Sequence, residues 1–396
     1  MNILFISMSL ELGCKDLYCD LIDSLLKRNH KITVVRSLPN ITNTTFQQQE
    51  SGLSVLDVKT GDPFSKNLFK KGLNQIMIGT YLKRAIKEYL SKESFDLILY
   101  ATPPVTLAGV VKFCKEKYHA KTFLMLKDIF PQNAVDLEMM SKNGIIFKYF
   151  RNQEKKYYKY SDYIGCMSQA NLEYVLKHNP EVKKEKIHIF PNSIEIDFTG
   201  KTIFNEDKTV FMFGGNLGKP QNISFLIDLS RRLKGYSKAE FIIVGGGTEQ
   251  GKIIEYVTNE KPANLKFNRR LPQEEYEKLL QTADVGLISL DPRFTIPNVP
   301  SRMQSYMKLK KPIFAITDTA TDIKDMILDN DCGWWCDARN LSDAEKIIKT
   351  ICENKKNQKK KGLNGFEFLK REFDVELNAD KIEDFYNNRN ERKTSN

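Results

Sequence analysis

A glycine-rich segment near the middle of the chain has the residue types that bind a phosphate group. Residues 208–226 read KTVFMFGGNLGKPQNISFL, an apolar stretch followed by glycines, one lysine and a second apolar stretch. Glycine lets backbone N–H groups approach an anion, a helix directs the positive end of its dipole at it, and Lys219 adds a full charge. We therefore expect a strand, a phosphate-binding turn and a helix. The alternative is that Lys219 is one solvated lysine among many.

Other polar residues follow predicted strands elsewhere in the chain. Asp128 comes after the apolar run 122–126, and Thr102 and Pro103 come after the run 96–100. The carboxyl ends of parallel strands meet at one edge of a sheet, where ligands bind. Asp128 suits a residue that orients or deprotonates a hydroxyl group, and the alternative is an aspartate that caps the next helical turn. Thr102 and Pro103 are expected to shape the same edge, although a simple turn would have the same sequence.

These candidates need a framework of alternating strands and helices, and the sequence predicts two such frameworks. In the first half, strands are predicted at 1–9, 31–36, 96–100, 122–126, 163–167 and 187–190, and helices at 17–27, 64–90, 105–116, 145–160 and in a segment ending at 178. The pattern restarts with strands at 210–213, 240–244, 265–267, 285–289 and 312–316 and helices near 224–233, 250–257, 274–281 and 301–308. Residues 41–62 are predicted to form a polar excursion. Alternating strands and helices indicate parallel sheets, so we predict an α/β fold of two facing Rossmann-like domains with a cleft between them.

The length of the chain also favours two domains, because 396 residues exceed one ordinary core. The restart of the pattern predicts a first domain over residues 1–195 and a second over residues 196–372. A helix over residues 373–387 is expected to pack back on the first domain. Residues 388–396 are expected to form a polar, disordered tail.

The charge of the chain indicates an anionic partner. Lys and Arg number 61 against 50 Asp and Glu, which leaves +11 and suits a nucleic acid, a phosphorylated substrate or an acidic membrane surface. Residues 64–90 and 148–160 both combine lysines with aromatic residues. Each is explained by a helix that packs on a sheet and has a solvated basic face, or by a helix that also lies against anionic lipid.

No feature of the sequence predicts a membrane-spanning, secreted or metal-binding protein. The N-terminal residues have no basic lead-in and no small-residue cleavage site, and no apolar run approaches the ~20 residues of a spanning helix, so we expect a cytoplasmic location. The seven cysteines form no C-x-x-C pair, and Cys332 and Cys336 have no histidine nearby. We expect reduced packing cysteines, surface or packing histidines, no metal and no cofactor.

The order of several motifs resembles a known family. The matching segments are 96–104, 126–132, 191–194, 213–221, 244–247, 282–287 and 299–306, followed by Lys311 and Pro312. In this order and spacing the chain resembles the bacterial retaining glycosyltransferases of family 4, which have the GT-B fold. Within them it resembles the branch that builds O-antigen and capsular polysaccharides, including fucosamine transferases. Single motifs are weaker, since Gly245 to Gly247 would also suit an ordinary turn after a Rossmann strand.

The resemblance implies that a sugar is moved with retention from a nucleotide sugar, expected to be UDP-linked, to a lipid-linked saccharide. An N-acetylated amino or deoxyamino sugar is the kind expected, and the enzyme would lie peripherally at the inner face of the cell membrane. Asp128 is the expected catalytic residue, with Thr102 and Pro103 on the acceptor side. The expected donor-binding residues are Gly214, Gly215, Asn216, Gly218, Lys219, Gln221, Gly245, Arg269, Pro300, Ser301, Arg302 and Ser305. Of Arg269 and its neighbour Arg270, one is expected only to face solvent.

One feature of the wider family is missing. Most members carry two glutamates around the loop and helix that hold the donor, and Pro297 and Ser305 occupy those positions here. We expect Pro300 to Arg302, at a helix start, to hold the diphosphate through N–H groups and the guanidinium. Either Ser305 or Gln304 would replace the contact with the ribose.

Two other functions stay open. A sugar-nucleotide epimerase of GT-B type would share the architecture, but such enzymes use several carboxylates and histidines, and no comparable set is seen here. A nucleic-acid-binding protein would explain the charge of +11. However, no zinc, helix-turn-helix or RNP-type motif is present and the basic residues are spread over both halves, so we expect no nucleic-acid partner.

Overall fold

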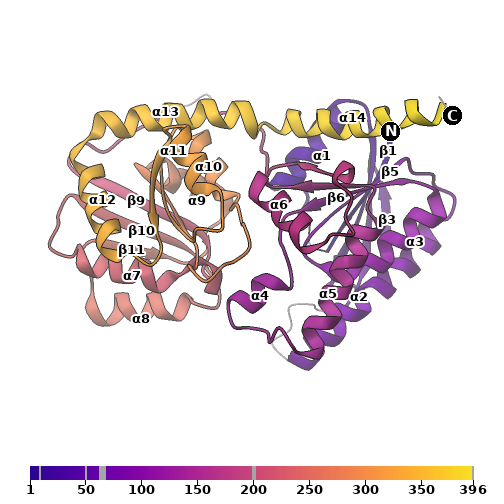
Figure 1. Ribbon diagram of the computed structural model, residues 1–396, viewed down its shortest axis with the longest axis horizontal. Helices are drawn as coiled ribbons and strands as arrows, with labels where there is room; N and C mark the ends of the chain where they lie inside the picture. The colour runs from indigo at the N-terminus through magenta and orange to yellow at the C-terminus, as the bar shows by residue number, and fades with distance from the viewer. Residues whose placement is uncertain (9, 50, 62–67, 199–201, 395–396) are drawn as a thin grey trace. The chain divides into compact units, whose positions relative to one another are not determined.

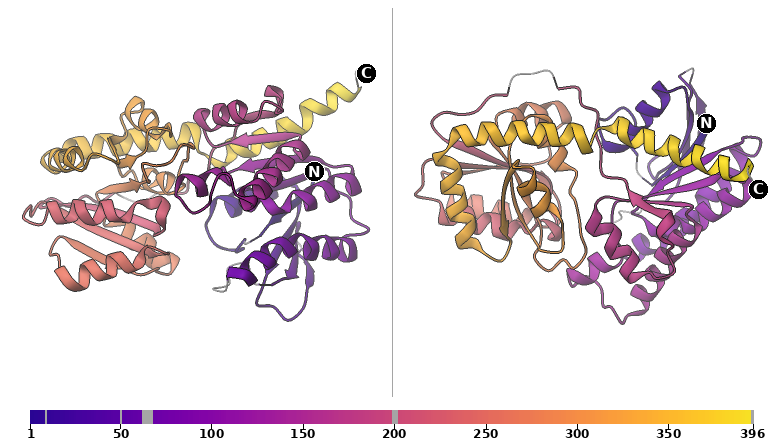
Figure 2. Two further views of the ribbon diagram at one scale, coloured as in Figure 1. Left: turned by 60° about the horizontal axis from the view of Figure 1, so that its bottom comes forward. Right: turned by 45° about the horizontal axis from the view of Figure 1, so that its top comes forward.

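The computed structural model describes residues 1–8, 10–49, 51–61, 68–198 and 202–394 of the chain (Figure 1). These residues form two compact units, one of Met1–Glu195 with Val375–Asn396 and one of Ile196–Asp374. In each unit, helices cover both faces of a sheet (Figures 1 and 2). The predicted α/β class with two Rossmann-like sheets is confirmed.

The first unit has an eight-stranded sheet with the order β3-β4-β2-β1-β5-β6-β7-β8. Its strands are β1 (Asn2–Ser7), β2 (Lys31–Leu38), β3 (Thr45–Gln48), β4 (Leu53–Lys59), β5 (Leu97–Ala101), β6 (Lys121–Leu126), β7 (Tyr163–Cys166) and β8 (Ile187–Ile189). Neighbouring strands pair in parallel, except that β3 runs antiparallel to β4. The chain fills one side of β1 first and then returns to β5 on the other side, so the strand order reverses between β1 and β5.

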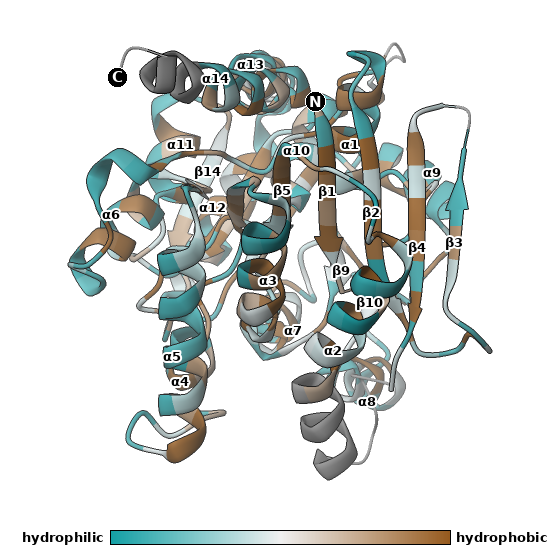
Figure 3. Ribbon diagram, turned by 90° about the vertical axis from the view of Figure 1, so that its right-hand side faces the viewer, coloured by the Kyte–Doolittle hydropathy of each residue, from teal (hydrophilic) through white to brown (hydrophobic). Residues whose placement is uncertain are grey.

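The helices of the first unit divide between the two faces of its sheet. On one face, α1 (Leu17–Lys27) and α14 (Val375–Thr394) pack with the apolar side chains of the central strands, which are brown in Figure 3. On the other face lie α2 (Leu68–Tyr89), α3 (Ala108–Tyr118) and α5 (Ile145–Tyr160). Asp16 caps α1 by accepting hydrogen bonds from two backbone N–H groups, each at 2.8 Å. The shorter elements are η1 (Val105–Leu107), α4 (Gln132–Asp136), α6 (Gln169–His178) and η2 (Lys184–Lys186).

The second unit has a six-stranded parallel sheet with the order β11-β10-β9-β12-β13-β14. Its strands are β9 (Thr209–Asn216), β10 (Ala239–Gly246), β11 (Leu265–Asn268), β12 (Val285–Ser289), β13 (Ile313–Thr317) and β14 (Gly333–Asp337). One face packs against α7 (Ile223–Arg232), α8 (Gln250–Glu260) and α12 (Leu341–Glu353). The other helices are α9 (Gln273–Gln281), α10 (Arg302–Lys308), α11 (Ile323–Asp329) and α13 (Lys355–Glu372), with η3 (Lys219–Gln221) after β9. Here the strand order reverses between β9 and β12.

The structure corrects two predicted regions. Residues 41–62, predicted to be a polar excursion, contain β3 and β4, and the apolar side chains of Val55, Leu56 and Val58 are buried in the sheet. The prediction was wrong because the polar residues of this region alternate with apolar ones, which is the pattern of a strand with one covered face. The last helix continues to Thr394, although residues 388–396 were predicted to be a disordered tail. The arginines, glutamate and lysine in this stretch are good helix formers, so a polar composition does not end the helix.

Other differences lie at the ends of elements. The predicted strand over residues 1–9 is observed as β1, and residue 9 lies outside the described residues. The predicted helix over residues 64–90 is described from Leu68, and residues 64–67 lie outside the description. Nowhere in the described ranges is a helix both long enough and apolar enough to cross a bilayer.

Candidate functional site

The glycine-rich segment lies where the strand order of the second sheet reverses. β9 runs through Asn216, so Gly214 and Gly215 belong to the strand, and the turn begins later than predicted. Gly215 has a φ of 131°, a backbone conformation that favours glycine. It pairs with Gly245 of β10, and a Cβ atom on Gly245 would overlap the carbonyl oxygen of Gly215. Gly245 therefore allows the two strand ends to approach closely.

The turn after β9 is braced by two of the residues that were predicted to bind the donor. The Gln221 side-chain oxygen accepts hydrogen bonds from the Gly218 backbone N–H at 3.1 Å and from the Asn216 amide at 3.3 Å. Lys219 is exposed at the start of η3. Helix α7 begins only at Ile223, so its start is separated from the glycines by η3. The structure thus gives Asn216 and Gln221 a role inside the turn and leaves Lys219 facing water.

Arg302 provides a cation next to the glycines. Its guanidinium carbon lies 4.3 Å from the centre of the Phe213 ring, and a Cβ placed on Gly215 would be 3.1 Å from Nη2. Burial lowers the pKa of Arg302. Its Nη1 atom is buried and has no hydrogen-bond partner in the part of the chain that the structure describes. A buried donor without a partner is costly, and an anionic oxygen would satisfy it.

Two tyrosines that the sequence analysis did not single out complete this edge. The Tyr306 hydroxyl donates to the Met212 carbonyl at 3.0 Å and accepts from the Gly214 N–H at 3.3 Å. The Tyr276 ring covers Gly214, since a Cβ there would overlap the phenol. Burial raises the pKa of Tyr276, and the nearby charge of Arg302 opposes this shift. Tyr306 lies in a recognised motif, but its contact with β9 depends on α10 packing under the sheet and is not visible in the sequence.

The remaining predicted donor residues lie at the same edge or near it. Arg269 follows β11 and is exposed, and β11 lies two strands from β9 in the sheet. Helix α10 begins at Arg302, so Pro300 and Ser301 precede it, and the Ser301 side chain makes no capping hydrogen bond. Ser305 is partly buried on α10. The structure therefore brings Gly214, Gly215, Gly245 and Arg302 together and leaves Arg269 further along the edge.

In the first unit, Asp128 and Thr102 lie in direct contact after neighbouring strands. The Thr102 hydroxyl donates to the Asp128 carbonyl at 3.0 Å and accepts from the N–H groups of Lys127 and Asp128 at 3.0 and 3.1 Å. The carboxylate of Asp128 accepts a hydrogen bond from the Asn133 amide at 2.8 Å. Thr102 therefore ties the end of β5 to the loop after β6, and this loop holds Asp128 at the carboxyl edge of the sheet.

The surroundings of Asp128 perturb its titration. Burial raises the pKa of Asp128 to about 6, against the opposing hydrogen bonds from Asn133 and the Ile129 N–H. An unfolded aspartate has a pKa of about 3.9, so the protonated form is favoured by folding. This contribution to stability is present below about pH 4 and is lost as the pH rises through about 6. At neutral pH the group is an ionised carboxylate with raised basicity, which is the state that a proton acceptor needs.

A small cavity opens where the strand order of the first sheet reverses. It measures about 170 Å³ and is lined by Phe5, Ile6, Ser7, Met8, Tyr18, Ala101, Pro103, Pro104 and Leu107. The predicted residue Pro103 therefore forms part of its wall. Burial, with the negative charges of Asp16 and Asp128, raises the pKa of Tyr18. Ligands of doubly wound sheets bind at such a reversal of strand order.

Lys127, next to Asp128, is a second titratable group that the sequence analysis missed. Its amine donates hydrogen bonds to the carbonyls of Phe190 at 3.3 Å and Pro191 at 3.1 Å. Burial lowers the pKa of Lys127 to about 7. Asn378 of α14 donates to the same Pro191 carbonyl at 2.8 Å. Lys127 thus links the Asp128 loop to a segment that α14 also holds.

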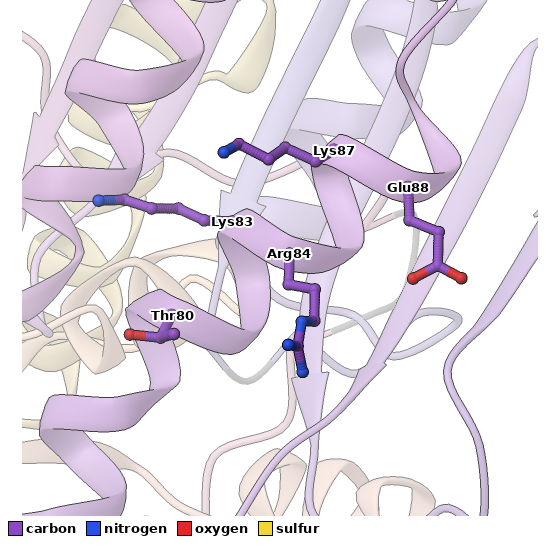
Figure 4. A pocket seen from close by; sticks show the side chains of 5 residues that line it. All are labelled: Thr80, Lys83, Arg84, Lys87 and Glu88. Atoms are coloured by element: carbon purple, nitrogen blue, oxygen red, sulfur yellow. The ribbon is translucent and has the colours of Figure 1, made fainter.

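Each of the two basic stretches lines a hollow on the first unit. A hollow of about 630 Å³ lies beside α2 and is lined by Thr80, Lys83, Arg84, Lys87 and Glu88 (Figure 4). A second one, of about 430 Å³, is lined by Asn152, Lys155, Lys156, Tyr158, Lys159, Tyr160, Glu181, Val182, Lys183 and Lys186. Both helices also bury apolar side chains against the sheet, including Leu82, Ile86 and Tyr157. The packing interpretation of these stretches is therefore confirmed, and their contact with lipid stays a prediction.

In the part of the chain that the structure describes, the cysteines and histidines form no metal centre. Among those residues, no three His, Cys, Asp or Glu side chains gather in a group that could hold an ion. All seven cysteines are free thiols. Cys332 and Cys336 donate to backbone carbonyls, at 3.6 Å to Ile327 and at 3.3 Å to Asn340.

Comparison with known proteins gives the class to which the two units correspond. Residues 17–198 match the family described as Glycosyltransferase Family 4, and residues 195–368 match the family described as Glycosyl transferases group 1. Each half of the chain thus matches a glycosyltransferase domain model, and the two doubly wound sheets are those of the GT-B fold.

The individual proteins that resemble this chain have low sequence identity to it. The probable glycosyltransferase WbjE of Pseudomonas aeruginosa is 25% identical over 272 residues, which span 65% of this chain and 66% of WbjE, just under two thirds of its length. The E. coli trehalose-6-phosphate structure bound with UDP-2-fluoro glucose has a TM-score of 0.75 at 9% identity and is matched over 98% of this chain and 99% of its own. Anabaena HepE in complex with UDP-glucose has a TM-score of 0.68 at 15% identity, over 97% and 99% of the two chains. At these identities the structural likeness shows the fold alone.

Proposed function

We propose that the protein transfers a sugar from a UDP-linked donor to a lipid-linked saccharide, with retention of the anomeric configuration. The observation that carries the proposal is the Arg302 guanidinium, which lies beside Gly215 and has a buried nitrogen without a partner in the described chain. A diphosphate supplies the anionic oxygen that such a nitrogen lacks. The glycines at the ends of β9 and β10 allow its backbone approach.

The donor half of the proposal assigns roles along the edge of the second sheet. Arg302 and Lys219 neutralise the diphosphate, and Pro300 and Ser301 lie at the start of the same helix. Ser305 or Gln304 contacts the ribose in place of the glutamate found in most members of the family. The UDP sugars bound by HepE and by the E. coli structure support a uridine nucleotide in this fold.

The acceptor half assigns Asp128 to the attacking hydroxyl group. The anomeric carbon loses its bond to the diphosphate oxygen and gains a bond to the acceptor oxygen on the same face, while the acceptor proton passes to a carboxylate or to the leaving diphosphate. A carboxylate with a pKa of about 6 is basic enough to orient the hydroxyl or take its proton. The cavity of about 170 Å³ beside Tyr18 and Pro103 accommodates part of the acceptor.

A lipid-linked acceptor places the enzyme at the inner face of the cell membrane, in the synthesis of a capsule or O-antigen. The basic hollows beside α2 and α5 support contact with an anionic surface. The fucosamine transferases remain the predicted branch, and an N-acetylated amino or deoxyamino sugar the predicted substrate.

A panel of nucleotide sugars tests the donor half directly. A ligand present at 100 times its dissociation constant adds about 2.7 kcal/mol to the free energy of unfolding, which is a readily measured shift in melting temperature. We expect a shift with at least one UDP-sugar, and a smaller shift with the same ligand in R302M. A panel that leaves the melting temperature unchanged, at ligand concentrations that saturate related enzymes, would contradict the donor assignment.

A further inference from the structure

Exposed apolar side chains gather at one place in the first unit. In the described part of the chain nine large apolar side chains are exposed, and four of them lie between residues 139 and 149: Met139 at 61%, Ile145 at 86%, Ile146 at 63% and Tyr149 at 37%. We call these four residues the apolar tip. Single exposed apolar residues are common on protein surfaces, but a cluster of them marks an interaction site.

The apolar tip is a defined structure at the start of α5. Ile145 and Tyr149 are four residues apart and Ile146 and Tyr149 three, so the three side chains share a face of the helix. The preceding turn is held by backbone hydrogen bonds from Met139 to Ala134 at 2.8 Å and from Gly144 to Ser141 at 3.0 Å. In Figure 3 the first turn of α5 is brown, whereas most of the helix is teal.

Most of the charges around the apolar tip are positive. Residues 136–160 include six basic residues and three acidic ones, of which Asp136 and Glu138 precede the tip and Glu154 is buried against Arg151 and Tyr158. Lys142 and Lys148 are both exposed and lie within the segment that carries the tip. An apolar helix face with lysines beside it matches an anionic lipid surface, where the lysines meet phosphates and the apolar side chains enter the acyl boundary.

The apolar tip lies on the same side of the first unit as Asp128. Helix α5 leads into β7 and runs opposite to the strands, so its first turn lies toward their carboxyl edge. Phe150 of α5 packs edge-to-face on Phe130, two residues after Asp128, with ring centres 4.9 Å apart. A lipid surface that takes up the tip would therefore lie next to the candidate acceptor site.

We propose that the apolar tip inserts into the anionic leaflet that carries the acceptor, with Lys142 and Lys148 paired to lipid phosphates. The insertion holds Asp128 at the depth where the saccharide leaves its lipid anchor. This inference rests on the proposed lipid-linked acceptor, and it commits to a lipid bilayer as the partner of the tip.

Vesicle binding tests the inference without the chemical reaction. The full chain is centrifuged with vesicles of phosphatidylglycerol and phosphatidylethanolamine, and separately with vesicles of phosphatidylcholine alone. The double variant I145S/I146S is compared with I203S, which removes an isoleucine that is 67% exposed in the second unit. Withdrawing one isoleucine from water contributes roughly tenfold in affinity, so the double variant should bind the anionic vesicles at least ~10-fold more weakly, while I203S binds as the parent does. K142Q/K148Q should lose about fivefold for each lysine on anionic vesicles only.

The possible outcomes test the partner of the apolar tip and the proposed function independently. If I145S/I146S binds vesicles as the parent does, the inference is overturned. It is also overturned if the parent is a dimer in gel filtration and I145S/I146S is a monomer, since that result would assign the tip to a second copy of the chain. Because both side chains are exposed, the variant should melt as the parent does. Transfer to a short water-soluble saccharide should be unaffected in I145S/I146S and lost in D128N. If the parent binds vesicles through the tip but transfers no sugar to any acceptor, the proposed function fails and the vesicle result still stands.

Discussion

Replacing Arg302 with methionine should separate ligand binding from stability. Methionine keeps much of the length of the side chain and can cover Phe213, but it removes the charge and the unpartnered Nη1. If Arg302 only supports the fold, its loss should lower the stability of the ligand-free protein. If Arg302 serves to bind a diphosphate, its loss should lower only the affinity for the donor.

The expected magnitudes follow from the contacts of Arg302. Loss of one charge-assisted hydrogen bond to the diphosphate costs about 1.5–3 kcal/mol, which is roughly a 10- to 100-fold weaker affinity for a UDP-sugar. In the empty protein, the lost contact with Phe213 costs about 0.5–2 kcal/mol, and removal of a buried unsatisfied donor returns about 1–3 kcal/mol. The loss therefore exceeds the gain by no more than about 1 kcal/mol, so the ligand-free variant should be destabilised by at most about 1 kcal/mol.

The assay is calorimetric titration with UDP and a UDP-sugar, together with thermal unfolding of the ligand-free proteins. Arg232 is the matched control, because it lies at the far end of α7, on the opposite edge of the sheet, and bonds to Ser342 and Glu345. R232M should bind the donor as the parent does. Unchanged donor affinity in R302M would refute the assignment. A loss of stability of 3 kcal/mol or more would show instead that Arg302 serves the fold, because a broken buried ion pair costs about 3–5 kcal/mol.

Three further predictions follow from the same geometry. D128N should leave donor affinity nearly intact, melt no lower than the parent at neutral pH and transfer sugar roughly 100-fold more slowly, whereas a turnover number within a factor of about three would give Asp128 a purely structural role. Since burial raises the pKa of Asp128 to about 6, kcat of the parent should rise as the pH passes through that value, and a flat profile between pH 5 and 7, roughly one unit on either side, would exclude Asp128 as the titrating group. G245A should lose about 2 kcal/mol or more in denaturant unfolding, because its Cβ would overlap the Gly215 carbonyl and its φ of 149° disfavours a side chain, and unchanged stability would show that the strand ends can separate.

The fold could be predicted where periodicity and glycine placement agree along the chain. Helices α1 and α5 and strand β12 are observed over the predicted residues, because the two helices have apolar residues at helical spacing and β12 is a short run that is buried throughout. Strands β3 and β4 were missed because their runs of apolar residues are short and are interrupted by polar residues. Strand β14 was also not assigned, and its side chains are only partly buried at Trp334 and Trp335.

The candidate site could be predicted only as far as linear motifs reach. Gly214, Gly215 and Arg302 lie in two segments that the sequence marks separately, and the sheet brings them together at one edge. Tyr276 could not be predicted, because its contact with Gly214 depends on the position of α9, far away in the sequence. The brace formed by Asn216 and Gln221 is likewise a property of the folded turn, since the same amides would suit a sugar hydroxyl equally well.

The most direct test of the account is a transfer reaction with mass balance. The full chain is incubated with single UDP-sugars, with and without a lipid-linked saccharide, and both UDP and the saccharide are measured by mass spectrometry. The account predicts that UDP appears only with the acceptor present and in equal amount to a saccharide enlarged by one sugar, and that R302M and D128N abolish most of it. If the UDP-sugar is consumed at the same rate without an acceptor, the protein is an epimerase. If the protein neither binds nor consumes any nucleotide sugar, the central claim is contradicted.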